Sequence, residues 1–106
     1  MKELDPEQAA ALIAEEAANP DFQIIDVRTL YEFANGRLPG AVRVTWDQDF
    51  AKNLEALDKH APCLVYCQSG MRSHQAVEYM EKAGFSRLFE LAGGIAAWKG
   101  KGLPVT

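Results

Sequence analysis

Apolar and polar positions recur along the chain with two periods, and together they predict the elements of an α/β protein. Short apolar runs, several rich in β-branched residues, predict strands at residues 23–27, 41–44, 62–66 and 87–91. Segments with helical spacing or helix start signals alternate with them and predict helices at residues 6–19, 30–35, 47–57, 73–83 and 95–99. This alternation favours an α/β fold with a small, mostly parallel sheet flanked by helices on both faces.

Two of the predicted elements have clear signals. The first helix begins with Asp5 as its N-cap, Pro6 as its first residue and Gln8 at the third position, which is the pattern of a capping box. Residues 62–66 are continuously apolar, as expected of a central parallel strand that is covered on both faces.

Length and composition set the class of protein. A chain of 106 residues with 48% hydrophobic and 25% charged residues can bury one core, so we expect a single domain over residues 1–106. The net charge of −4 is scattered and Lys and Arg form no cluster, so neither nucleic acid nor a membrane is an expected partner. No apolar stretch resembles a signal peptide or a membrane span, and we expect a cytoplasmic monomer.

The cysteines and histidines do not indicate a metal site or a disulfide. Cys63 and Cys67 lie four residues apart in a predicted strand and its end, where an extended backbone holds them beyond disulfide reach. His60 and His74 are isolated, and no second cysteine pair follows. We therefore expect two reduced thiols and no metal.

The stretch VYCQSGMRSH, residues 65–74, breaks at Cys67 from apolar to small and polar residues. In an open α/β sheet, ligands bind beyond the carboxyl ends of the strands, and Cys67 stands at such an end just before a helix. Gly70 lets the backbone amides of residues 68–73 turn inward around the sulfur, and Arg72 adds a positive charge. Amides, a helix N-terminus and an arginine all lower the pKa of a thiol, so Cys67 is a candidate nucleophile rather than a core filler.

The loop from Cys67 to Ser73, with four residues between Cys67 and Arg72, resembles the active-site loop of the rhodanese family of single-domain sulfurtransferases. Three further segments are similar to motifs of that family, in the same order: Ile25-Asp26-Val27-Arg28, Gly36-Arg37-Leu38-Pro39-Gly40-Ala41, and Ala83-Gly84-Phe85 with Gly93-Gly94-Ile95 and Trp98. Arg37 departs from the pattern, because the family commonly has His there.

The resemblance implies a rhodanese-like fold and a sulfur transfer in two steps without a cofactor. Cys67 would take the outer sulfur of thiosulfate or of a persulfide and hold it as a persulfide until cyanide or a thiol accepts it. From the residues themselves, the loop offers amides for the negatively charged terminal sulfur and the Arg72 guanidinium for an anionic donor. The expected substrate-binding residues are Gln68, Ser69, Gly70, Met71 and Arg72.

We expect supporting or inert roles for the neighbouring polar residues. Asp26 and Arg28 are interpreted as a structural pair at a strand end, because a buried carboxylate needs a partner. Cys63 is expected to be a packed, unreactive thiol. His74 is expected to be solvated and not to act as a general base, since a thiolate needs none.

Two alternatives to a small-molecule sulfurtransferase stay open. A phosphatase or arsenate reductase of the same fold has a similar loop, but that branch resembles C-x5-R, whereas four residues separate Cys67 from Arg72 here. The shorter loop favours sulfur transfer. The other alternative is a relay or binding module that hands the Cys67 persulfide to a protein acceptor.

Overall fold

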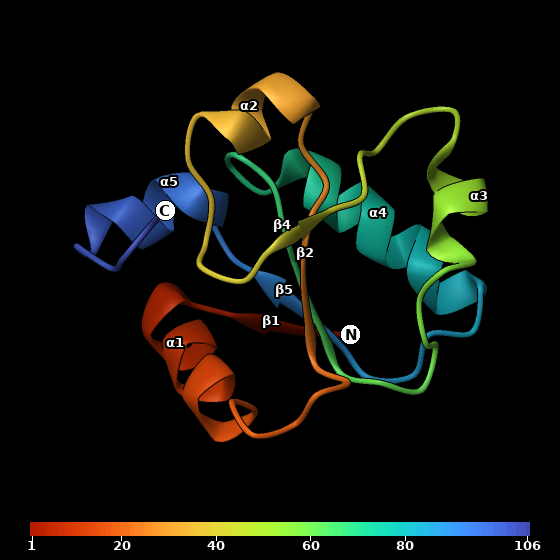
Figure 1. Ribbon diagram of the computed structural model, residues 1–106, viewed down its shortest axis with the longest axis horizontal. Coiled ribbons are helices and arrows are strands. Elements are labelled where there is room, and N and C mark those ends of the chain that lie inside the picture. The colour runs from red at the N-terminus through yellow and green to blue at the C-terminus, as the bar shows by residue number, and fades with distance from the viewer.

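A five-stranded sheet forms the centre of the computed structural model, which describes residues 1–106 (Figure 1). Its strands are β1 (Lys2–Leu4), β2 (Gln23–Asp26), β3 (Val42–Arg43), β4 (Cys63–Tyr66) and β5 (Leu88–Leu91). They lie in the order β1-β5-β4-β2-β3, and every neighbouring pair is parallel. The predicted α/β fold with a parallel sheet is confirmed.

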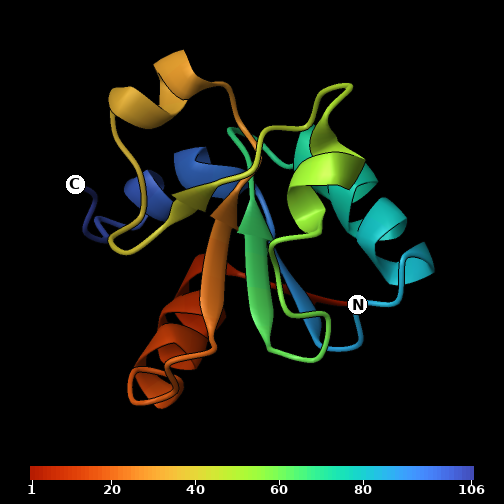
Figure 2. The same cartoon turned by 45° about the vertical axis from the view of Figure 1, so that its right-hand side comes forward.

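Five helices surround this sheet: α1 (Pro6–Glu15), α2 (Leu30–Ala34), α3 (Phe50–Leu54), α4 (Met71–Lys82) and α5 (Gly94–Gly100). Helices α1 and α5 cover one face of the sheet, and α3 and α4 cover the other (Figures 1 and 2). Helix α2 lies beyond the carboxyl ends of β2 and β4 (Figure 2). Helices on both faces are therefore confirmed as well.

Strand β4 contributes to both layers of the core because successive side chains of a strand point to opposite faces. Cys63, Val65 and Cys67 pack on the side of α4, in a cluster that includes Val77 and Met80. The intervening residues of the strand belong to the cluster on the side of α1 and α5. Since each large apolar side chain buried in this way contributes roughly 1.5–3 kcal/mol, the two layers hold β4 firmly at the centre.

The structure corrects several predicted boundaries. Strand β1 was not predicted: two of its three residues are charged, and as an edge strand it pairs only with β5. Helix α1 has the predicted capping box at Asp5 and Gln8 but ends at Glu15, and α3 covers only part of residues 47–57. Helix α4 begins at Met71, two residues earlier than predicted, because Gly70 takes the N-cap position with a φ of 111°.

The turn before α5 lies against the backbone that follows β4. Gly94 has a φ of 62°, and a Cβ at this position would approach the Cys67 carbonyl oxygen to 2.5 Å. The next two amides fix the contact: Ile95 N–H donates to Cys67 O (2.9 Å) and Ala96 N–H donates to Gln68 O (3.0 Å). The first residues of α5 thus hold the backbone of the loop after β4 in place.

Replacing Gly94 with Ala should destabilise the protein by about 3 kcal/mol, since the new Cβ adds backbone strain and a clash with residues 67–68. Urea denaturation measures this loss in the free energy of unfolding. Gly100→Ala is the matched control in the same helix, because nothing lies within 4 Å of a Cβ there. Equal unfolding free energies for the two variants would contradict the described contact.

Candidate active site

Strands β2 and β4 place two loops side by side at one edge of the sheet. The strands are parallel neighbours in which Asp26 lies opposite Tyr66, and Val27 N–H extends the pairing to Tyr66 O (3.0 Å). Because both strands end at the same edge, Arg28 and Cys67 begin adjacent loops. The sequence motifs around residues 26–28 and 67–73 therefore converge in space.

The Cys67 sulfur lies in a cradle of hydrogen-bonding groups. The residue is 1% exposed; Gly70 N–H donates to Sγ (3.1 Å), and Sγ lies 3.3 Å from Ser73 Oγ. Burial raises the pKa of the Cys67 thiol, but hydrogen bonds with the Ser73 hydroxyl and with the amides of Ser73, Gly70 and Ser69 outweigh it and lower the pKa. The first turn of α4 adds its dipole in the same direction. The site favours a thiolate.

Cys63 has the opposite chemistry although it lies only four residues before Cys67, at the start of β4. Both cysteines are free, and Cys63 is fully buried with Sγ 3.6 Å from Ala61 O. Burial raises the pKa of the Cys63 thiol to about 11. Cys63 is therefore protonated at neutral pH, and the two thiols differ in reactivity because of their surroundings alone.

The loop side chains after Cys67 lie mostly in solvent. Gln68, Ser69 and Met71 are exposed, with Met71 at 77%, and Gly70 is half-buried. The Gln68 Oε1 accepts a hydrogen bond from Arg28 Nη1 (3.3 Å). Backbone amides of this loop thus face the sulfur while its side chains form an exposed rim.

Asp26 and Arg28 form a buried, bidentate ion pair. Arg28 Nε donates to Asp26 Oδ1 (3.0 Å) and Nη2 donates to Oδ2 (2.7 Å). Both residues are at most 3% exposed, and Nη2 also donates to the Gly36 carbonyl (2.6 Å). With its bond to Gln68, Arg28 connects three loops at the edge of the sheet. Removing one partner of such a buried pair costs about 3–5 kcal/mol.

Arg37, which departs from the motif that its turn resembles, packs within its own turn. Its guanidinium lies 4.6 Å from the centre of the Phe33 ring, and Nη1 donates to Phe33 O (3.2 Å). Its backbone N–H donates to Thr106 O, and its backbone carbonyl accepts from Thr106 N–H. Arg37 therefore stabilises the turn after α2 and the C-terminal end.

Glu32 is a site residue that the sequence did not indicate. Arg72 Nη1 and Nη2 donate to the two Glu32 carboxylate oxygens at 2.7 and 2.9 Å. The hydrogen bonds from Arg72 lower the pKa of Glu32 to about 2, so the pair is ionised at neutral pH. The guanidinium expected to be free for a donor thus has a carboxylate partner from α2, 40 residues away in the chain.

A buried carboxylate also lies behind Ser73. The Ser73 hydroxyl lies 3.0 Å from Glu90 Oε2 and 3.2 Å from Gly70 O, and Glu90 is 1% exposed. His74 is exposed, as expected, yet its Nδ1 lies 3.3 Å from Glu90 Oε1. The signal that sequence reasoning missed is a glutamate in the otherwise apolar part of residues 87–91, where a doubly covered strand should be apolar.

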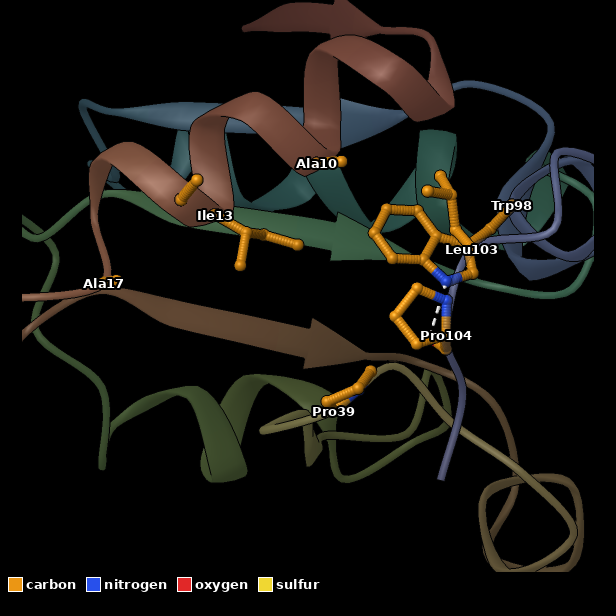
Figure 3. A pocket seen from close by; sticks show the side chains of 8 residues that line it. Ala10, Ile13, Ala17, Pro39, Trp98, Leu103 and Pro104 are labelled. Atoms are coloured by element: carbon orange, nitrogen blue, oxygen red, sulfur yellow. Dashed lines mark hydrogen bonds between the residues drawn. The ribbon is translucent and has the colours of Figure 1, made fainter.

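The cavities of the structure lie away from Cys67. An apolar cavity of about 320 Å³ opens between α1, α5 and the C-terminal segment, where Trp98 Nε1 donates to Pro104 O (2.9 Å) (Figure 3). None of the three cavities borders residues 67–72. No three His, Cys, Asp or Glu side chains are grouped so that they could hold a metal ion. None of the helices has the length and apolar character needed to cross a membrane.

Comparison with known proteins identifies the family of the chain. Residues 5–101 match the family model described as a rhodanese-like domain. A sulfurtransferase of Allochromatium vinosum is 32% identical over 105 residues, which cover 99% of this chain and 94% of the relative. The thiosulfate sulfurtransferase GlpE of Glaesserella parasuis is 29% identical over 103 residues, covering 97% and 91%. The crystal structure of the Alr3790 protein from Anabaena superposes with a TM-score of 0.83 at 31% identity, covering 97% of this chain and 81% of that one. The chain belongs to the family of rhodanese-like domains.

Proposed function

We propose that this protein moves a sulfane sulfur from thiosulfate or a persulfide to a thiophilic acceptor through a persulfide on Cys67. The observation that carries the proposal is the buried Cys67 Sγ, which accepts from Gly70 N–H at 3.1 Å and lies 3.3 Å from the Ser73 hydroxyl. Relatives of nearly the same length that are named sulfurtransferases support the general activity. The name of the Glaesserella relative supports thiosulfate as a donor.

In the donor step, the Cys67 thiolate attacks the outer sulfur of thiosulfate. A bond forms between Sγ and that sulfur, the sulfur–sulfur bond of thiosulfate breaks, and sulfite leaves with the bonding electron pair. With a persulfide donor the leaving group is a thiolate. No oxidant is consumed, because the transferred sulfur keeps its oxidation state, and the nucleophile is regenerated in the second step.

In the acceptor step, cyanide or a thiolate attacks the terminal sulfur of the Cys67 persulfide. The bond to Sγ breaks, and the thiolate of Cys67 leaves as an anion. The same groups that lower the pKa of Cys67 stabilise this leaving group, so the cradle assists both halves of the cycle. The terminal sulfur carries negative charge in between, and the amides of residues 68–72 are the donors available to it.

The donor would bind at the exposed rim of the cradle. Arg72 is partly exposed, and its bidentate contact with Glu32 leaves other N–H groups of the guanidinium free for the sulfonate oxygens of thiosulfate. Glu32 repels a dianion at the same place. We infer that Glu32 positions the plane of Arg72 at a cost in affinity for an anionic donor.

The length of the loop separates this proposal from the phosphatase and arsenate reductase alternative. Four residues lie between Cys67 and Arg72, and the Gly70 amide already contacts Sγ directly. A tetrahedral phosphoryl group centred over Sγ needs a wider ring of amides. A single sulfur atom does not.

The physiological acceptor of the sulfur is either a small molecule or another protein. Exposed Met71, Leu30 and Tyr31 give the surroundings of the loop a partly apolar character that could contact a protein acceptor. We favour small-molecule transfer and keep persulfide relay to a protein as the alternative. A cytoplasmic monomer that binds neither nucleic acid nor membrane remains our prediction for its setting.

Cys67→Ser should abolish thiosulfate-dependent formation of thiocyanate from cyanide, because it removes only the nucleophile and Ser is nearly isosteric. Cys63→Ser is the matched control: it removes the other thiol, at the start of β4, and should keep activity, with a small loss of stability. Activity is followed by thiocyanate production, and folding by circular dichroism. A folded but inactive Cys63 variant together with an active Cys67 variant would reverse the assignment of the two thiols.

Insertion of one Gly after Ser69 should lower sulfur transfer about a hundredfold, since the amides lose their common focus on the sulfur. The widened loop should also bind phosphate-like oxyanions more tightly than wild type. Insertion of Gly after Pro20, in the exposed turn between α1 and β2, controls for chain length. Wild-type hydrolysis of aryl phosphates that depends on Cys67, or undiminished sulfur transfer by the Ser69 insertion, would refute the argument from loop length.

Glu32→Gln should lower the KM for thiosulfate about fivefold, corresponding to about 1 kcal/mol, because the guanidinium of Arg72 then faces the dianion without a neighbouring carboxylate. The KM for an uncharged polysulfide donor should stay unchanged. Glu81→Gln removes an equal charge at the far end of α4 and serves as the control. A raised KM for thiosulfate in Glu32→Gln would mean that holding Arg72 in place outweighs the repulsion.

A further inference from the structure

Glu90 is a buried charged residue that the proposed sulfur transfer does not use. It lies on β5, with Val65 of β4 beside it on one side and Glu3 of β1 on the other. Its side chain faces α4, where both carboxylate oxygens have partners: Oε2 lies 3.0 Å from Ser73 Oγ and Oε1 lies 3.3 Å from His74 Nδ1. A carboxylate in a central strand costs free energy unless its partners compensate, so its contacts deserve a functional explanation.

Ser73 connects this carboxylate to the nucleophile. Its Oγ lies 3.3 Å from Cys67 Sγ, and the same oxygen contacts Glu90 and the Gly70 carbonyl. A hydroxyl has one proton to donate, so it can serve either the carboxylate or the sulfur, but not both. When it donates to Glu90, the oxygen can accept from the Cys67 thiol. When it donates to Cys67, the sulfur is favoured as a thiolate.

The far end of this chain of contacts reaches solvent at His74. The imidazole side chain is 54% exposed, and its Nε2 lies 3.7 Å from Glu78 on the next turn of α4. The hydrogen bond with Glu90 raises the pKa of His74, and the charges of Glu90, Glu78 and Glu3 act in the same direction. The residue of β4 that lies beside Glu90 is the apolar Val65, so β4 places no charge next to this carboxylate. The acidic surroundings of Glu90 are thus balanced by His74 alone.

We propose that Glu90 is a positioning residue for the nucleophile: its carboxylate competes with Cys67 Sγ for the single proton of the Ser73 hydroxyl, while His74 holds that carboxylate in place. When Cys67 ionises, its S–H bond breaks, the electron pair stays on Sγ and the proton leaves to solvent. The Ser73 hydroxyl keeps its own proton and turns from Glu90 Oε2 to donate to the thiolate.

This inference rests on the proposed role of Cys67 as the nucleophile. It adds that the ionisation of Cys67 is coupled to the charge on a carboxylate that never contacts substrate. Ser73 and Glu90 are fixed by the fold, because both are buried and lie on the facing elements α4 and β5. The coupling can be measured without any sulfur transfer.

Glu90→Gln tests the coupling in a Cys63→Ser background. The Gln amide donates to Ser73 Oγ, which commits the Ser73 hydroxyl to the sulfur, so the midpoint of iodoacetamide alkylation against pH should fall by about one unit. Glu3→Gln, which removes a neighbouring charge without touching Ser73, is the matched control and should shift the midpoint much less. An unchanged midpoint in Glu90→Gln overturns the proposal.

Ser73→Ala separates a path through the hydroxyl from a field effect through space. Without the hydroxyl, adding Glu90→Gln should shift the midpoint by less than a third of its effect in the presence of Ser73. A full shift in the Ser73→Ala background would show that Glu90 acts by its charge alone and would overturn the path.

A further test leaves Ser73, His74 and Glu90 intact and needs only the Cys67→Ser variant for comparison. The NMR resonances of the His74 ring should show an additional inflection at the alkylation midpoint of Cys67, and this inflection should vanish in Cys67→Ser. His60, in the loop before β4, is the internal control and should not respond. A His74 titration that is identical with and without the Cys67 thiol overturns the coupling. Sulfur transfer is assayed separately, so a failure of the proposed function would leave these results unaffected.

Discussion

The chemistry of this protein depends on one constraint: a sulfur atom that is buried in the core must still be stable as an anion. Burial alone would make Cys67 as unreactive as Cys63, which lies four residues earlier at the start of β4. The difference comes from the backbone after β4, which turns at Gly70 and points amides at Sγ before α4 begins. Hydrogen bonds to a charged group contribute roughly 1.5–3 kcal/mol each, so a few oriented donors can outweigh the cost of burying the thiolate.

Two ion pairs lie beside this turn, and they differ in how far water can reach them. Asp26 and Arg28 are buried, so their pairing is permanent and fixes the relative position of neighbouring loops. Arg72 and Glu32 are partly exposed, so the guanidinium can accept an additional anionic partner at low cost. The same arginine–carboxylate chemistry thus forms a fixed support in one place, whereas in the other it fits the binding role that we propose for Arg72.

The sequence predicted what is encoded locally and missed what depends on contacts across the sheet. The loop after Cys67 was predictable because a glycine, an arginine and a helix start follow within six residues. Strand β1 was not, because its charged residues pair only through the backbone. Glu32 meets Arg72 from 40 residues away, and nothing near either residue indicates the other. Glu90 did leave a signal, as a charge in an apolar strand, but its partners on α4 became visible only with the fold.

The central claim is that Cys67 carries the transferred sulfur. Intact-mass spectrometry of the wild-type protein after incubation with excess thiosulfate and removal of small molecules measures this directly. The account predicts a gain of one sulfur atom per chain, located by peptide mapping on Cys67 and lost on addition of cyanide. A protein whose mass does not change with thiosulfate or with a persulfide donor, or whose added sulfur maps to Cys63, would contradict it.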